Sequence, residues 1–314
     1  MNTGNSEARA VTAALAGKWM GTYGLCKCVA HHDTEPSLSV SQGRDGKLLL
    51  NCHAGCIFTS ILNALRARGI VSGEGHEPTV DPAALHRAEM QAAKEMGEKA
   101  RRARQIWNEA GPLWGSVGEN YLRARGLGSP RSTVHLRCHG SLYHAPSGQH
   151  LPAMVAEISG VPDFAIHRTF LMPDGSGKID VAPAKLMLGQ TAGGVVVLDH
   201  PAEGTPLLIG EGIETTLAAS ELTGRKHTVW AALSAANMAR VTLLGMPGVL
   251  GMSDTLVICA DGDPAGRQAA DTLATRADRL GWKVSILEAP DGQDALDMLL
   301  ARRAANTLRG AAHV

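Results

Sequence analysis

Two clusters of acidic residues each follow an apolar run that has the length of a β-strand. Residues 207–209 lead into Glu211, and residues 256–260 lead into Asp261 and Asp263. Carboxylates that follow buried strands lie at the edge of an open α/β sheet, which is where ligands of such sheets bind. Because acids packed together repel one another, they favour a bound cation. The pattern therefore predicts a Mg²⁺ site suited to phosphoryl chemistry.

The region around these acids alternates between apolar runs and helical patterns. The expected strands are residues 207–209, 228–233, 255–260 and 283–287. The expected helices are residues 213–223, 235–243, 265–280 and 294–303. Four strand-to-helix alternations are typical of a parallel sheet with covering helices. We therefore expect a parallel α/β domain over residues 205–305.

Four of the six cysteines lie within residues 26–56, together with three histidines. Two ligand pairs separated by a β-like span predict a zinc ribbon, which we expect over residues 17–70. The best four ligands are Cys28, His31, Cys52 and Cys56. Four protein ligands leave no open position, so the Zn²⁺ is expected to be structural. Replacement of one ligand by a neighbouring Cys26, His32 or His53 stays open.

The middle of the chain is less regular. Residues 71–106 are expected to form a linker and a helix, with the helical pattern running over residues 83–107. Residues 107–204 carry a short helical pattern and β-like runs separated by Gly and Pro turns, which predicts a mixed α+β subdomain. The long helix carries a basic run of Lys99, Arg101, Arg102 and Arg104. That run is either a solvated face or a nucleic-acid contact.

Charge and hydropathy exclude several classes of protein. The formal net charge is zero, so any nucleic-acid surface must come from local segregation of charge. No apolar run approaches the ~18 residues that a membrane span requires. The N-terminus has no positive-then-apolar signal pattern. We therefore expect a cytoplasmic protein without a membrane partner, in which the cysteines do not form disulfides.

Several stretches resemble one family, the DnaG-type DNA primases. Residues 28–40 are similar to the zinc-ribbon opening of bacterial and phage primases, and residues 50–56 to the second knuckle of the phage and plasmid branch. Gly210-Glu211-Gly212 and Asp261-Gly262-Asp263 resemble the two acidic motifs of Toprim domains, which primases share with topoisomerases and some nucleases. Residues 290–297 resemble the acidic tail motif, although Ala295 and Leu296 replace the usual aromatic–Asn pair. Elements of the primase core are similar to residues 121–127, 151–154, 165–168 and 183–189.

The resemblance implies a DNA primase that makes short RNA primers on single-stranded DNA by nucleotidyl transfer. Glu211 would be the general base or metal organiser, and Asp261 and Asp263 would hold Mg²⁺ or Mn²⁺. Asp297 would complete the metal shell, with Asp294 as the less favoured candidate. The zinc ribbon would bind the template, and the nucleotides would enter as nucleoside triphosphates.

The resemblance also implies residues that bind substrate and a setting in the cell. Arg168, Lys185 and Lys178 would bind triphosphate or template phosphates, and Arg125 would reach the template. The sequence contains no Gly-x4-Gly-Lys-Ser/Thr motif, so a replicative helicase is expected as a separate chain. The replicon would be a phage, a plasmid or an integrated element.

Two other functions remain open at this point. A Toprim-type nuclease would use the same carboxylates for hydrolysis. A replication module that binds single-stranded DNA without catalysis would have no need of the acids at residues 211, 261 and 263. Strand transfer of the topoisomerase type is disfavoured, because none of the three tyrosines lies in an evident winged-helix segment.

Overall fold

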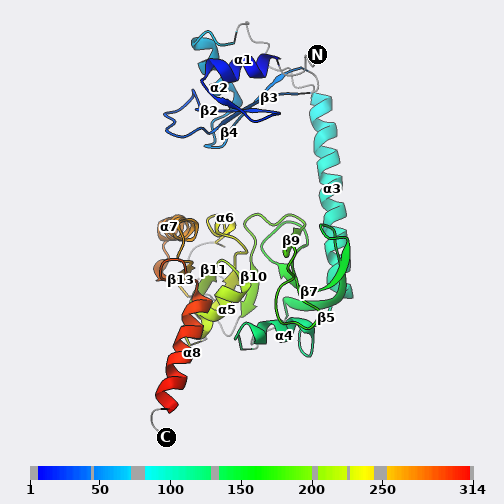
Figure 1. The fold of residues 1–314 in the computed structure, drawn as a ribbon, viewed down its shortest axis with the longest axis vertical. Coiled ribbons are helices and arrows are strands. Elements are labelled where there is room, and N and C mark those ends of the chain that lie inside the picture. The colour runs from blue at the N-terminus through cyan, green and yellow to red at the C-terminus, as the bar shows by residue number, and fades with distance from the viewer. Residues whose placement is uncertain are drawn as a thin grey trace. The chain divides into compact units, whose positions relative to one another are not determined.

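A computed structural model describes residues 6–43, 46–71, 82–128, 134–199, 204–224, 227–243 and 253–311. The chain divides into two compact units, Met1–Leu85 and His86–Val314, which are described separately below. Figure 1 labels their helices and strands. None of the helices within the described ranges is both long and apolar enough to cross a membrane.

The first unit is a small antiparallel sheet covered by two helices. Its elements are α1 (Ser6–Ala14), β1 (Lys18–Trp19), β2 (Gly24–Cys26), β3 (Leu38–Gln42), β4 (Leu48–Cys52) and α2 (Phe58–Ala67). The strand order is β1-β2-β3-β4, and every pairing is antiparallel. Ala8 and Val11 of α1 are buried in one core with Leu38 of β3 and Ile61 of α2. This module therefore includes residues before position 17, where the sequence pattern began it.

The second unit begins with a long helix and an antiparallel sheet. These elements are α3 (Pro82–Glu109), β5 (Gly111–Pro112), α4 (Val117–Ala124), β6 (Leu136–His144), β7 (Gln149–Ile158), β8 (Ala165–Phe170) and β9 (Lys185–Leu188). The strand order is β5-β6-β7-β8-β9, with antiparallel pairing throughout. The predicted helix over residues 83–107 corresponds closely to α3. The short strands β5 and β9 were not expected from the sequence.

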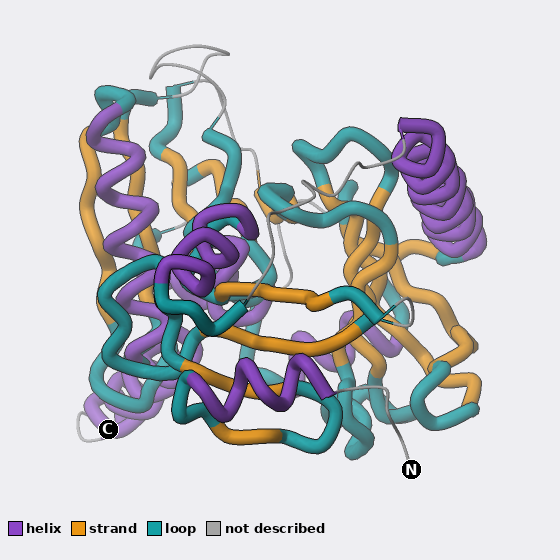
Figure 2. Tube along the Cα trace, turned by 90° about the horizontal axis from the view of Figure 1, so that it is seen from above, coloured by secondary structure: helices purple, strands orange, loops and turns teal. Residues whose placement is uncertain are grey.

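Side chains of this middle sheet alternate between two different cores, because successive residues of a strand point to opposite faces. Val155, Ile166 and Phe170 pack against Ile106 and Trp107 of α3. Figure 1 shows the lower part of α3 running beside these strands, and Figure 2 shows the same helix beside strands in the view from above. On the other face, residues such as Met154 and Ala165 join the core that includes α4 and the C-terminal sheet.

The C-terminal part is a five-stranded sheet between two layers of helices. It comprises β10 (Val196–Asp199), β11 (Leu207–Gly210), α5 (Ile213–Leu222), β12 (Thr228–Ala231), α6 (Ala235–Met238), β13 (Thr255–Ala260), α7 (Pro264–Arg279), β14 (Lys283–Glu288) and α8 (Ala295–Ala311). The strand order is β10-β12-β11-β13-β14. The last four strands in that order are parallel, as predicted, and α5 and α8 cover one face while α6 and α7 cover the other. The predicted fold class is confirmed.

One strand lies in a different sheet from the one that the sequence suggested. The β-like run at residues 195–198 was expected in the middle subdomain, but β10 pairs antiparallel with β12 at the edge of the C-terminal sheet. The isolated bridge between Ser159 and Val195 leads the chain from one sheet into the other. A single apolar run carries no information about its pairing partner, which is why the sequence did not place it.

The sheet topology brings the two acidic motifs together. Strands β11 and β13 are parallel neighbours, with Leu208 opposite Val257 and Ile209 opposite Ile258. The acidic motifs that follow β11 and β13 therefore lie at the same edge of the sheet, at the carboxyl ends of its strands. The loop after β14 closes over this edge, because Gly262 donates to the carbonyl of Gln293 at 2.8 Å and accepts from Gly292 at 2.8 Å.

Gly262 is expected to tolerate no side chain. A Cβ at this position would collide with the carbonyl oxygen of Pro290. We predict that Gly262→Ala lowers the free energy of unfolding by about 1–3 kcal/mol, measured by urea denaturation with tryptophan fluorescence. Gly177→Ala is the matched control, because a Cβ added there would meet no heavy atom within 4 Å, and it should change stability by less than about 0.5 kcal/mol. Equal stability of the two variants would contradict the close approach.

Candidate functional site

Three carboxylates meet at the edge of the C-terminal sheet. Glu211 follows β11, Asp261 follows β13, and Asp263 is the N-cap of α7. The Asp263 side chain accepts a hydrogen bond from the amide of Gly266 at 2.7 Å, which satisfies one of the free amides at the helix start. The Pro at the first turn of α7 fits the same helix start. The N-cap hydrogen bond of α7 thus fixes the position of the Asp263 carboxylate.

The charge of this carboxylate cluster is only partly balanced by the residues that the structure describes. Burial, followed by the negative charges of Glu211, Asp294 and Asp263, raises the pKa of Asp261 to about 7. Burial also raises the pKa of Glu211, and Asp263 adds to the effect. The Oδ1 atom of Asp261 is buried and has no hydrogen-bond partner within the part of the chain that the structure describes. Clustered, under-compensated oxygen ligands fit a divalent cation such as Mg²⁺ or Mn²⁺.

A strained loop after β12 holds Glu211 in place. The amide of Ala235, at the start of α6, donates to the Glu211 carboxylate. Leu233 has a φ of 73°, in the left-handed region that a leucine rarely adopts, and its amide donates to the Glu211 carbonyl at 2.6 Å. Backbone strain of this kind persists where surrounding contacts enforce it and is concentrated at functional sites. No motif in the sequence pointed to a role for this loop.

The two acids of the tail motif occupy different positions. Asp294 raises the pKa of Asp261, which places it within electrostatic range of the cluster. The Asp297 side chain is exposed and accepts from the amide of Asp294 at 3.0 Å, while Asp294 accepts from the amide of Asp297 at 3.0 Å. This reciprocal arrangement caps α8. Both aspartates therefore take part in the cap, and Asp294 in addition lies within electrostatic range of the carboxylate cluster.

Glu214 lies in a buried ionic cluster rather than with the other acids. Its carboxylate is 5% exposed and lies 3.4 Å from the ammonium groups of both Lys178 and Lys185. Tyr121 of α4 donates its hydroxyl proton to the same carboxylate. Burial alone would raise the pKa of Glu214, but the two lysines and the tyrosine lower it to about 2. Glu214 is consequently ionised and joins α5 to the middle sheet.

Lys185 lies between this ionic cluster and the carboxylate cluster. Its charge lowers the pKa of Glu211 and Asp261 as well as that of Glu214. A Cβ on Gly212 would lie 4.0 Å from its Nζ atom. The ammonium group of Lys185 is suited to contact an anionic group that binds next to the carboxylate cluster. The middle sheet thus supplies a positive charge to the edge of the C-terminal sheet.

The remaining predicted phosphate-binding residues lie on opposite faces of the middle sheet. Lys178 lies in the ionic cluster, and the exposed Arg125 lies close enough to lower the pKa of Lys178. Arg168 lies on the opposite face of the middle sheet from Lys185, where its Nη2 donates to the Met187 carbonyl at 3.0 Å. The structure brings Lys178, Lys185 and Arg125 together and separates Arg168 from them.

Two further residues of this region were not predicted from the sequence as site residues. Tyr121 lies in a stretch that resembles the primase core, but its contact with Glu214 joins residues that are remote in the chain. His167 is 3% exposed, and burial together with the charge of Lys185 lowers its pKa to about 4, so the imidazole is neutral at pH 7. Its Nδ1 and the Oγ1 of Thr169 are buried without a partner among the described residues. The alternation of His167 and Thr169 along β8, continued by Leu171 directly after the strand, was the signal that these side chains share one face.

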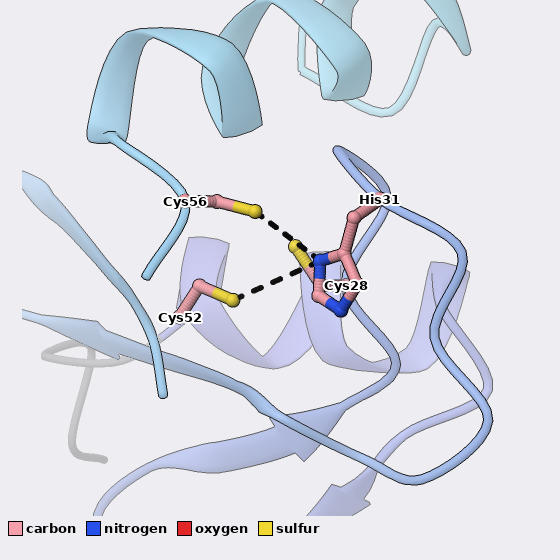
Figure 3. Close-up of side chains that lie close together, drawn as sticks. All are labelled: Cys28, His31, Cys52 and Cys56. Carbon is pink, nitrogen blue, oxygen red and sulfur yellow. Dashed lines mark hydrogen bonds between the residues drawn. The ribbon is translucent and has the colours of Figure 1, made fainter. Parts of the chain in front are cut away.

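The first unit contains a second candidate metal centre. The ligand atoms of Cys28, His31, Cys52 and Cys56 all lie within 4.8 Å of one another. Figure 3 shows the four side chains converging, with the His31 Nδ1 3.2 Å from Cys56 Sγ and 3.9 Å from Cys52 Sγ. Three thiols and one imidazole in this arrangement suit a closed tetrahedral Zn²⁺ site.

Two of the three alternative ligands at this centre interact with other residues. Cys26 is fully buried and interacts with Thr12, and His53 bonds to the Ser39 hydroxyl at 2.9 Å. His32 is not part of the four-residue group. The quartet expected from the sequence is therefore the one that converges within the described residues.

Neighbouring groups stabilise one thiolate of the quartet and contact its imidazole, whereas burial raises the pKa of Cys28 and Cys56. Although burial alone would raise it, the pKa of Cys52 falls to about 6, because the amides of Cys56 and Ala54 and the Ser37 hydroxyl stabilise the thiolate. Asp33 Oδ2 accepts from the Cys28 amide at 2.6 Å, while its Oδ1 lies 3.6 Å from the Nε2 of His31. Such outer contacts orient the ligand imidazole and fix which nitrogen faces the metal.

Comparison with known proteins identifies the C-terminal part by family. Residues 206–305 match the model of the Toprim domain, and residues 97–198 match a domain of unknown function, DUF7146. No curated protein matches the chain. The C-terminal parallel sheet is thus a Toprim domain, and the domain of unknown function covers most of the middle subdomain.

Several solved structures are similar to the chain at low identity. A DNA primase domain from Pseudomonas aeruginosa is 16% identical, with a TM-score of 0.40 over 65% of this chain and 74% of that one. The zinc-binding and RNA polymerase domains of Aquifex aeolicus primase are 14% identical, with a TM-score of 0.39 over 96% and 83%. The primase fragment of the bacteriophage T7 primase-helicase protein is 14% identical, with a TM-score of 0.40 over 92% and 99%. At these scores the likenesses assign no activity to this chain.

The quartet of the first unit should determine the zinc content. We predict that purified protein retains one Zn²⁺ per chain after dialysis and that Cys56→Ser retains much less, as measured by atomic emission. Loss of one ligand also removes metal-coupled folding energy, so this module should unfold at a lower temperature. Cys138→Ser removes a buried thiol of the second unit and should leave the zinc content unchanged. A Cys56→Ser protein with full zinc would contradict the assignment.

The buried charge of Glu214 should be important for stability. We predict that Glu214→Gln lowers the free energy of unfolding at pH 7 by about 2–3 kcal/mol, because two lysines and a tyrosine lose their ionised partner. Since the pKa of Glu214 is lower in the folded state, its contribution is present above about pH 4.5 and is lost as the pH falls toward 2. The difference between the two proteins should therefore shrink in acid.

A surface pair provides the control for this measurement. Glu288→Gln breaks the exposed pair with Arg267 and should cost less than about 1 kcal/mol at any pH. Unfolding is followed by urea denaturation at a series of pH values. A stability difference for Glu214→Gln that stays constant from pH 7 to pH 3 would show that the ionised carboxylate is not what stabilises the fold.

Proposed function

We propose that this protein is a DNA primase that joins ribonucleotides on a single-stranded DNA template. The observation that carries the proposal is the cluster of Glu211, Asp261 and Asp263 at one edge of a Toprim sheet, with Lys185 beside it. The zinc-type quartet in the same chain supports it, because the sequence resemblance to DnaG-type primases includes a zinc ribbon ahead of the Toprim motifs.

In this proposal the three carboxylates hold Mg²⁺ or Mn²⁺. Such a cation, when bound, favours ionisation of the attacking 3′-hydroxyl and neutralises charge on the pyrophosphate that leaves. Glu211 is held by the amide of Ala235 and Asp263 by the amide of Gly266, so neither side chain needs to reorganise during the reaction. Asp294 is the nearer candidate for a further ligand, and Asp297 remains the prediction from the motif.

The basic residues near the cluster bind phosphate in this proposal. Lys185 is held by Glu214 and lies toward the carboxylates, so it is suited to the triphosphate of the incoming nucleotide. Lys178 and Arg125 extend the positive charge along the same face. Glu214 acts as the positioning residue for both lysines, because it fixes their ammonium groups without contact with the substrate.

The zinc module and a helicase complete the proposed system. The first unit would bind the template, as the zinc ribbon of the resembled family does. A replicative helicase on a separate chain, and a phage, plasmid or integrated element as the replicon, remain predictions from the sequence.

A priming assay tests the proposal. The protein is incubated with mixed-sequence single-stranded DNA, four ribonucleoside triphosphates and Mg²⁺ or Mn²⁺, and labelled RNA is resolved on a gel. We predict short RNA products that depend on both template and metal. Asp261→Ala should lower their synthesis by about 10²–10³-fold, because it removes several kcal/mol of charge stabilisation around the phosphates.

The control and the opposing outcomes are distinct. Asp271→Ala removes an exposed aspartate on α7, away from the cluster, and should retain wild-type synthesis. Metal-dependent cleavage of the template without RNA synthesis would instead assign a Toprim-type nuclease. If the protein neither synthesises RNA nor cleaves the template when a helicase is present, the primase proposal is refuted. A non-catalytic DNA-binding module would then be the remaining interpretation.

A further inference from the structure

A groove lies between α3 and the face of the middle sheet that is remote from the carboxylates. Two adjoining cavities of about 610 Å³ each form it, and they share Glu98, Arg102 and Tyr143 as lining residues. One wall is α3, which contributes Lys99 and Arg102. The other is the sheet, which contributes Tyr143 of β6 and Arg168 of β8.

The separation of this groove from the carboxylate cluster follows from strand alternation. Thr169 is opposite Lys185 in the register of β8 and β9, so those two side chains share one face. Arg168 is opposite Leu186 and points to the other face, where Leu186 and Leu188 pack toward α3. The groove is therefore a second site on the middle subdomain, on the face of the sheet opposite to Lys185.

Positive charge in the groove is incompletely paired. The Nε of Arg168 is buried and has no partner within the described part of the chain, and its Nη2 reaches only a backbone carbonyl. Arg102 is close enough to lower the pKa of Arg168 further, so two guanidinium groups repel one another across the groove. Glu95, Glu98 and Glu109 also line the groove. Glu95 accepts a hydrogen bond from Gln91, and Glu109 accepts one from Gln105 and lies 3.6 Å from the His139 ring. Two adjacent cations favour an anion such as a phosphate between them.

Aromatic side chains lie at the same groove. Tyr143 is 43% exposed, and its ring centroid lies 5.3 Å from that of His150. The two residues are opposite one another on the β6–β7 hairpin. An exposed aromatic pair beside arginines is the combination that binds a base by stacking and its phosphate by charge. A phosphate ion alone would need no aromatic pair.

We propose that this groove binds a single strand of nucleic acid, with phosphates at Lys99, Arg102 and Arg168 and a base against Tyr143 and His150. The open, two-chamber groove fits a strand of several nucleotides better than one mononucleotide. It also explains the basic run on α3, for which the sequence left two interpretations. The proposal extends the nucleic-acid handling of the proposed function, but binding is measured without any synthesis.

The test uses the full-length protein and a fluorescent single-stranded oligonucleotide in buffer without divalent cation or nucleotide. Affinity is measured by anisotropy over a range of salt concentrations. Lys99→Ala/Arg102→Ala should weaken binding and make the slope of log affinity against log salt shallower by about 1.4, since each phosphate contact contributes about 0.7 for a single strand. Tyr143→Ala should weaken binding about tenfold through lost stacking. These side chains are exposed, so the variants are expected to fold, and thermal unfolding checks this.

A second readout locates the strand, because the zinc module can also bind DNA. An oligonucleotide that carries 5-iodouracil is photo-crosslinked, and the modified peptide is identified by mass spectrometry. We expect a crosslink at the Tyr143–His150 hairpin that is lost in Lys99→Ala/Arg102→Ala. Arg279→Ala, an exposed arginine on α7 outside the groove, should preserve both the crosslink and the salt slope.

The salt slope and the crosslink together decide whether the groove binds a single strand. An unchanged salt slope together with no crosslink at the hairpin would overturn the proposal, even if the protein makes primers. A crosslink and a reduced slope would support it, even if no primers are made. Protection of the hairpin by ATP alone, with no oligonucleotide crosslink, would assign a mononucleotide site and overturn the single-strand assignment.

Discussion

The buried carboxylate of Glu214 is the interaction on which the arrangement of the second unit depends. It receives the Tyr121 hydroxyl from α4 and lies 3.4 Å from Lys178 and Lys185, so it connects the middle subdomain to α5 of the Toprim domain. A buried charge is tolerated only when partners surround it, and removal of any partner leaves the others unsatisfied. The relative position of the two sheets is thereby tied to the position of Lys185, and Lys185 in turn lies toward the carboxylate cluster.

The two sites of the second unit follow from opposite electrostatic conditions. At the strand ends the negative groups outnumber their partners, and the pKa of Asp261 rises to about 7. In the groove against α3 the positive groups of Arg102 and Arg168 lie close together, and burial lowers the pKa of Arg168. The first condition favours a cation and the second an anion. With a formal net charge of zero, the chain reaches both conditions only by separating its charges within the fold.

Much of this could be predicted from local patterns. The eight strands and helices expected over residues 205–305 begin within one residue of their expected positions, because apolar runs and helical periodicity are signals within a single segment. Two ends were predicted less well, since α6 ends at Met238 rather than 243 and α8 continues to Ala311 rather than 303. The quartet of Cys28, His31, Cys52 and Cys56 was predictable for a similar reason, since the chemistry of thiol and imidazole restricts what such spacing can do. Strand β10 could not be assigned to its sheet in this way, because pairing partners are remote in sequence.

The sequence by itself determined the element types, the acidic motifs at two strand ends and the favoured candidates for the metal quartet, all of which depend on neighbouring residues. Only the tertiary structure decided which charges meet. It placed Asp294 near Asp261, because the loop that precedes α8 is hydrogen-bonded to Gly262, and it engaged both Asp294 and Asp297 in the cap of α8. It also separated Arg168 from Lys185, because a shift of one residue along β8 reverses the face of the sheet, and which face meets α3 is set by packing.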